Sequence, residues 1–175
     1  MNEYAGFWER TGAFVLDYLL ILGYLSGLTL FTLLFNVLSG EIPWLFADRI
    51  RSQIVAFLLV TLPVAVYFAI GESSVRQATW GKRRLTLKVA DRDGGQIPFW
   101  RAFWRTALKF IPWEISHTLI WHMRFSPRAD AAFVGYGFLL VYGLIGLNIA
   151  SLLLTPQHQT LYDFLARTYV MRSRA

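Results

Sequence analysis

The chain has 175 residues, of which 55% are hydrophobic and only 16% charged, and its mean hydropathy is +0.43. This composition excludes an ordinary soluble domain of this length and predicts a polytopic membrane protein. The formal charge of +6 lies beside apolar segments, which favours anionic lipid headgroups over nucleic acid as its partner. Without cysteine the chain can form neither disulfides nor thiolate metal sites.

The first predicted span covers residues 11–38, which carry one charge, Asp17, and exceed the roughly 20 residues needed to cross the hydrocarbon. No basic n-region or small-residue cleavage site precedes it, so we expect a retained helix rather than a removed signal peptide. Arg10 lies two helical turns before Asp17 on the same face, about 10 Å away along the axis. Because ionisable groups are costly at membrane depth, we expect each to meet a third group, with Asp163 as the candidate.

The second predicted span covers residues 50–70, and we expect Pro63 to kink it. Residues 131–154 contain no charge and predict a further span. Between them, residues 107–123 are apolar but interrupted by Lys109, Pro112, Glu114 and His117. This segment is either a short third span that faces protein or an interfacial helix.

The distribution of basic residues favours four spans over three, because such residues accumulate in short cytoplasmic loops. Four spans place both termini in the cytoplasm and leave only Arg49, Arg51, Arg124 and Arg128 outside. Three spans would move the C-terminal arginines, including Arg174, outward.

The cytoplasmic segment of residues 72–106 is predicted to have structure of its own. Residues 85–90 alternate between apolar and polar side chains, and the Asp-Gly step at 93–94 signals a turn, so we expect a small β-hairpin. Residues 99–109 predict an amphipathic helix in the headgroup plane, with rings inward and charges toward phosphates; it can equally form the first turns of the next span. Candidate lipid-phosphate contacts are Lys82, Arg83, Arg84, Arg101, Arg105 and Lys109. For residues 82–84 the alternative is plain positive-inside anchoring.

The C-terminal segment of residues 156–172 is predicted to hold a cytoplasmic helix and a strand. Thr155 and Pro156 are a plausible N-cap and first helical residue. Residues 168–171 are typical of a short strand that could pair with the hairpin.

Other motifs support no enzyme. Glu114 and His117 share a helix face and could form a metal site or proton relay, but no third ligand has suitable spacing, which favours polar packing. His158 lacks a nucleophile in a recognisable context. The Gly-Lys step at 81–82 lacks the earlier glycine of a phosphate loop, since that position is Arg76. We therefore expect no catalytic residues, no metal and no cofactor.

Two patches of small residues predict close helix contacts, either within the chain or between subunits. The first helix contains Gly23, Ser26 and Gly27, and the last span contains Gly135, Gly143 and Gly146.

The chain resembles the RDD family of small bacterial membrane proteins, which is named for one arginine and two aspartates. The resemblance is carried by the arginine and aspartate of the first helix, by ATWGKRRLTLKVADRDGG, and by LYDFLART near the end. By position, it implies that Arg10, Asp17 and Asp163 are the family's three charged residues and that Gly81 and Lys82 are its Gly-Lys pair. Arg84 and Thr86 depart from the leucine and glycine common in similar members.

The resemblance implies transport of unidentified ligands or cation/proton antiport. From the residues, the charges at 10, 17 and 163 are either an ion or proton site or a structural staple. The expected protein is an all-α, single-domain membrane protein over residues 1–175, with four transmembrane helices and the small cytoplasmic hairpin. We expect it in the bacterial inner membrane as a homo-oligomeric carrier of a small cation and a proton, with a membrane scaffold as the alternative.

Overall fold

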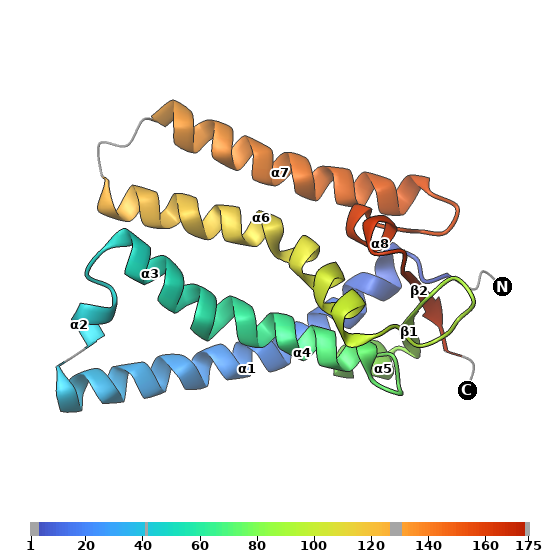
Figure 1. The fold of residues 1–175 in the computed structure, drawn as a ribbon, viewed down its shortest axis with the longest axis horizontal. Helices are drawn as coiled ribbons and strands as arrows, with labels where there is room; N and C mark the ends of the chain where they lie inside the picture. The colour runs from blue at the N-terminus through green and yellow to red at the C-terminus, as the bar shows by residue number, and fades with distance from the viewer. Residues whose placement is uncertain (1–3, 41, 127–130, 174–175) are drawn as a thin grey trace.

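Long helices make up most of the computed structural model, which describes residues 4–40, 42–126 and 131–173 (Figure 1). The helices, in chain order, are α1 (Phe7–Ser39), α2 (Ile42–Leu45), α3 (Arg49–Ala56), η1 (Phe57–Thr61), α4 (Leu62–Ser73), α5 (Trp80–Arg84), α6 (Phe99–Phe125), α7 (Ala131–Leu154) and α8 (Leu161–Leu165). By length and composition, α1, the continuous run from α3 to α4, and α7 can each cross a membrane. These three match the predicted spans at 11–38, 50–70 and 131–154.

The predicted segment at 107–123 forms part of α6, which begins much earlier, at Phe99, and has 27 residues. The expected interfacial helix and the third segment are therefore one helix. Figure 1 shows α6 lying between the run from α3 to α4 and α7, and it packs against both. Shielding by these neighbours allows α6 to be more polar than they are.

A π-helical turn, η1, interrupts the second span immediately before Pro63. The Leu62 N–H donates to the Phe57 carbonyl, five residues back, where a regular helix would use the fourth. Because proline lacks an N–H and crowds the preceding turn, such a widened turn accommodates it without breaking the helix.

The prediction of a β-hairpin within residues 72–106 is wrong. The sheet has two strands, β1 (Leu87–Ala90) and β2 (Tyr169–Arg172), which pair antiparallel with Val89 opposite Val170. The turn at 91–95 does form, and Gly94 takes a φ of 82° there, but no strand follows it. Instead Ile97 enters the core and Pro98 caps α6. The expected strand at 168–171 is confirmed, and it is the partner of β1.

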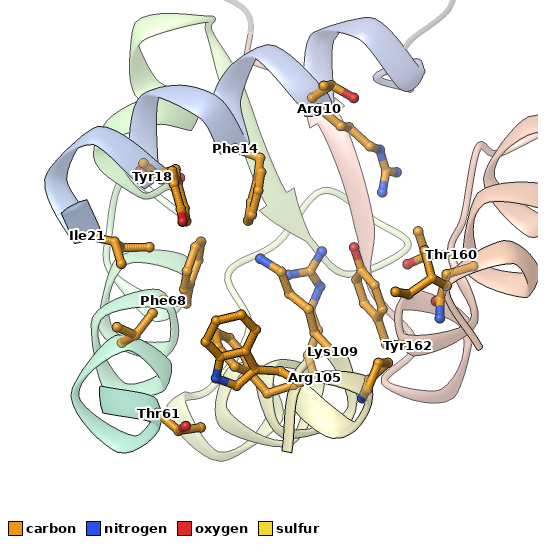
Figure 2. A pocket seen from close by; sticks show the side chains of 18 of the residues that line it. Arg10, Phe14, Tyr18, Ile21, Thr61, Phe68, Arg105, Lys109, Thr160 and Tyr162 are labelled. Atoms are coloured by element: carbon orange, nitrogen blue, oxygen red, sulfur yellow. The ribbon is translucent and has the colours of Figure 1, made fainter. Parts of the chain in front are cut away.

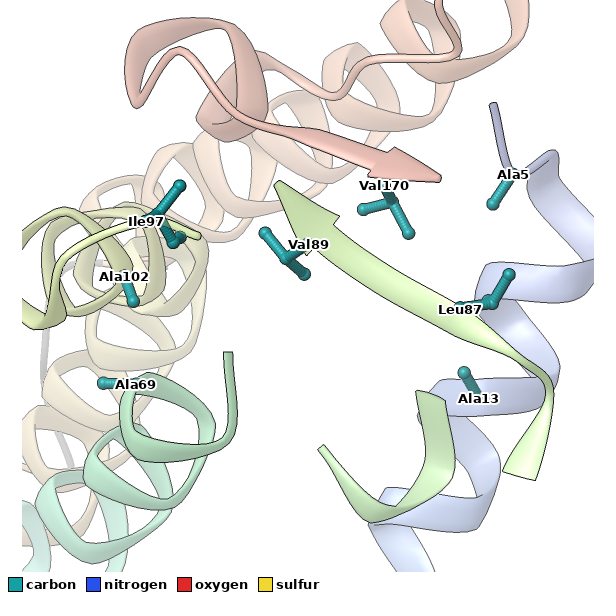
Figure 3. Packing of buried hydrophobic residues seen from close by; sticks show 8 residues of the cluster. All are labelled: Ala5, Ala13, Ala69, Leu87, Val89, Ile97, Ala102 and Val170. Carbon is teal, nitrogen blue, oxygen red and sulfur yellow. The ribbon is translucent and has the colours of Figure 1, made fainter. Parts of the chain in front are cut away.

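A small apolar core fills the space between the sheet and the helix ends. It contains Ala5, Ala13, Ala69, Leu87, Val89, Ile97, Ala102 and Val170 (Figure 3). Half of these are alanines, which let α1, α4 and α6 approach the sheet closely. The core thus joins both ends of the described chain to the helices.

The C-terminal helix begins later than predicted. Thr155 donates its N–H to the Ser151 carbonyl, so residues 155 and 156 follow directly on the end of α7 instead of starting a helix. Thr160 is the N-cap of α8, and its hydroxyl accepts the Asp163 N–H at 3.3 Å. The capping sequence is therefore Thr-Leu-Tyr-Asp, which places Asp163 in the first turn.

Candidate functional site

Arg105 of α6 is the centre of a buried ion-pair network. Its side chain is 2% exposed, and both of its carboxylate partners, Glu72 of α4 and Asp163 of α8, are fully buried. The Arg105 Nη1 lies 2.8 and 2.7 Å from the two Glu72 oxygens. Its Nε and Nη2 lie 2.8 and 2.6 Å from Asp163 Oδ1. The planar guanidinium fork therefore binds one carboxylate on each side.

Each carboxylate of the network has a second cation. Arg10 Nη1 of α1 lies 2.5 Å from Asp163 Oδ2, and Lys82 Nζ of α5 lies 2.8 Å from Glu72 Oε1. Cations and carboxylates thus alternate along a chain of five side chains from five different helices. This alternation satisfies the charges that burial would otherwise make costly.

Asp163 is held as an anion. Burial alone raises the pKa of its carboxyl, but the guanidinium groups of Arg105 and Arg10 outweigh burial and hold the pKa well below its usual range. The backbone N–H of Thr160 adds a third donor at 3.3 Å.

We expect the stability supplied by Asp163 to be lost in acid. A carboxyl whose folded pKa is lowered binds fewer protons when folded, so it stabilises the protein above its unfolded pKa of about 3.9 and ceases to do so as the pH falls through the folded pKa. The difference in unfolding free energy between wild type and Asp163→Asn should be constant above about pH 5 and narrow below about pH 4. Unfolding in mixed micelles measures it. If the difference in unfolding free energy between the two proteins stays constant down to pH 3, the ion pairs do not lower the pKa of Asp163.

Asp17 lies apart from Arg10. Its carboxylate is 1% exposed and accepts the Tyr67 hydroxyl at 2.7 Å, the Thr79 hydroxyl at 2.5 Å and the Gly81 N–H at 2.7 Å. It therefore fastens the turn before α5 to α1. Of the three residues expected to share a site, the structure brings Arg10 and Asp163 together and gives Asp17 neutral donors.

The expected orientation of residues 99–109 is wrong in part. Trp100 and Trp104 are 74% and 56% exposed, whereas Arg105 and Lys109 face the interior. This orientation arises because α4 and α7 cover α6. Arg105 and Lys109 then find carboxylate and aromatic partners inside the protein. Lys82 is likewise buried and paired, so three of the six predicted headgroup contacts point inward. Arg83, Arg84 and Arg101 are exposed.

A cavity of about 510 Å³ adjoins the network (Figure 2). Its walls come from α1, η1, α4, α5, α6, α7 and the C-terminal segment, and they are mainly apolar. Figure 2 shows Arg10 and Phe14 of α1 reaching toward Arg105 and Lys109 of α6. Lys109 Nζ lies 3.7 Å from the ring centre of Phe68 and 5.2 Å from that of Phe14. Asp17 also lines this cavity.

Glu114 and His117 belong to a second polar cluster farther along α6. Glu114 accepts hydrogen bonds from Thr61 and from Gln53, the latter at 3.0 Å, and its Oε1 lies 3.5 Å from His117 Nδ1. Within residues 4–40, 42–126 and 131–173, no group of three or more potential ligands could hold a metal ion.

Sequence reasoning missed Glu72. It follows the apolar part of the second span and resembles a loop residue in the sequence. The available signal was charge balance, because Lys82 and Arg105 had no assigned acid although both lie in segments that border the membrane.

A family model described as RDD family matches residues 4–167, which include all three charged residues of the resemblance and the Gly-Lys pair. The chain belongs to the RDD family. No curated protein and no solved structure matches it. Among the described residues of this RDD chain, the family arginine pairs with one of the two family aspartates, Asp163. The other, Asp17, binds the backbone of the Gly-Lys pair at Gly81.

Proposed function

We propose that this membrane protein is a small ion-coupled carrier whose substrate site is the cavity beside Arg105. The observation that supports this function is Lys109, a cation on the cavity wall that has no carboxylate or hydrogen-bond partner among the described residues. A network that served the fold alone would not need an unpaired cation. Ionisable groups at this depth indicate a binding function by default.

Four spans are part of this proposal, with α6 as the third. At 1.5 Å per residue its 27 residues extend about 40 Å, more than the roughly 30 Å of hydrocarbon. The two ends of the described chain also lie together, since Tyr4 pairs with Met171 and Ser173 donates to Thr86. A chain that starts and ends at one side of the helices crosses an even number of times. We place that side on the cytoplasmic face of a bacterial inner membrane, where the exposed arginines of the protein would meet anionic headgroups.

Proton coupling would use Asp17, which lines the cavity and has neutral donors. Protonating it breaks no ion pair, whereas protonating Glu72 or Asp163 would remove one of the two carboxylates that pair with Arg105. In one version of this mechanism, the carrier exchanges a small cation for a proton at Asp17. In the other version, it moves an anion together with a proton, and the positive charge of Lys109 favours this second version.

A second copy would complete a pathway that one small bundle cannot enclose. The glycines at 23, 27, 135, 143 and 146 have no atom within 4 Å of an added Cβ. The predicted close contacts therefore do not form among the described residues, and these surfaces remain open for a contact between subunits.

The scaffold alternative is supported by the Arg105 network itself. Its five alternating charges join α1, α4, α5, α6 and α8, which is what a structural staple requires. A scaffold predicts no flux and no chemistry, and in neither case do we propose an enzyme or a cofactor.

Flux in proteoliposomes distinguishes the carrier from the scaffold. Purified protein is reconstituted with a luminal pH dye, and gradients of sodium, potassium, phosphate or decanesulfonate are imposed singly. We expect proton movement with one of these gradients, and a rate lower by roughly a hundredfold in Asp17→Asn, as when a proton-transfer group is lost. Asp48→Asn is the matched control, because Asp48 is half-exposed and asparagine also caps α3. Absence of flux in wild type with every gradient would favour the scaffold.

A further inference from the structure

The charges around the cavity do not balance. Four cations, Arg10, Lys82, Arg105 and Lys109, line it, whereas three carboxylates, Asp17, Glu72 and Asp163, lie on its wall or in the network. Each carboxylate already accepts at least two donors. Among the described residues, Lys109 contacts the faces of Phe68 and Phe14 and forms no direct ion pair, and the carboxylates of Glu72 and Asp17 act on it from a greater distance. We therefore assign the excess positive charge to Lys109. Aromatic faces compensate an ammonium group only in part.

A second unused donor lies on the same wall. Arg10 lines the cavity, and its Nη2 is buried without a hydrogen-bond partner in the described part of the chain. Its Nε and Nη1 are occupied by the Ala5 carbonyl and Asp163. Arg10 and Lys109 thus offer two cationic donors to a ligand in the cavity. The wall also carries one neutral acceptor, Asn148 Oδ1 of α7, which is buried without a hydrogen-bond partner in the described part of the chain. Two cationic donors favour an anionic group as the ligand.

The rest of the cavity is mainly apolar. Beyond the cations, its walls are formed by side chains such as Ile21, Leu25, Val64 and Ile145. Packing closes the sides between α4 and α6 and between α6 and α7, and Tyr24 of α1 bonds to the Leu59 carbonyl of η1 at 2.5 Å. The described parts of α1 and α7 do not pack along each other in this way. A chain of methylene groups can therefore pass between them into the bilayer.

We infer that the cavity binds an amphiphile from the bilayer with an anionic head and an apolar chain. The head contacts Lys109 and the free N–H of Arg10, and the chain extends between α1 and α7. This inference rests on the proposed substrate site and names the substrate class. Phosphate, carboxylate and sulfonate heads share the required chemistry, and the volume suits a ligand of ordinary size.

The test measures binding to full-length protein in phosphatidylcholine nanodiscs by calorimetry. Decanesulfonate is the probe, decanol has the same chain without the charge, and methanesulfonate has the head without the chain. We expect decanesulfonate to bind about tenfold tighter than either, since it alone uses both ends of the cavity. Equal affinity for decanol, or for methanesulfonate, overturns the proposal.

Variants at Lys109 locate the head. Lys109→Met keeps the length of the side chain and should weaken decanesulfonate binding about tenfold, whereas Lys109→Arg keeps the charge and should bind within about threefold of wild type. Lys88→Met is the matched control, because Lys88 bonds to the Gly94 carbonyl outside the cavity. Unchanged binding in Lys109→Met overturns the proposal, and so does equal weakening in Lys88→Met.

The binding and flux experiments can contradict the substrate class and the carrier function independently of each other. Binding of decanesulfonate without flux would support the binding site but contradict the proposed carrier function. Flux with sodium or potassium, without binding of decanesulfonate, would support the carrier function but contradict an anionic amphiphile as the substrate.

Discussion

Replacing Arg105 with methionine should lower the free energy of unfolding by about 3–5 kcal/mol, the loss typical of removing one partner from a buried charge pair. Methionine fills much of the same space but leaves Glu72 and Asp163 each with one cation instead of two. Both carboxylates are fully buried, so water cannot replace the lost guanidinium. Equilibrium unfolding in mixed micelles measures the change.

Arg101→Met is the matched control for this variant. Arg101 lies one helical turn before Arg105 and is exposed, so the same chemical change should cost less than about 1 kcal/mol. Arg105→Lys keeps a charge but loses the two-sided fork, and we expect an intermediate loss. If Arg105→Met unfolds at the same free energy as Arg101→Met, the network does not stabilise the fold.

Replacing Gly81 with alanine should destabilise the protein by about 3 kcal/mol or more, at the upper end for forcing an extra carbon into a packed site. A Cβ at this position would lie 2.1 Å from the Ala13 carbonyl oxygen and 2.9 Å from the Asp17 backbone nitrogen. These are backbone atoms of α1, so no rotamer change relieves the overlap. The turn would have to move away from α1, and Asp17 would lose the Gly81 N–H.

Gly143→Ala serves as the control for the glycine substitution. Its added Cβ would meet nothing within 4 Å, and alanine favours a helix over glycine by about 1 kcal/mol, so this variant should be as stable as wild type or more so. Equal stability of Gly81→Ala and Gly143→Ala would contradict the close contact between α1 and α5.

The sequence by itself determined the membrane class, three of the long helices and the family. Runs of apolar residues are sufficient for this, because the length needed to cross a bilayer is fixed by its thickness. It also identified Arg10, Asp17 and Asp163 as residues to examine, since charges next to apolar segments are rare and costly. The strand at 168–171 was also predicted from its local sequence.

Only the tertiary structure decided which charges meet. Helical spacing gives the face on which Arg105 and Lys109 lie but not which neighbour covers that face, and the covering helices α4 and α7 turned both side chains inward. Glu72 could not be assigned because its partners are distant along the chain. For the same reason the second strand beside β1 came from the C-terminus: pairing across 80 residues depends on packing against the shared core, which no local pattern encodes.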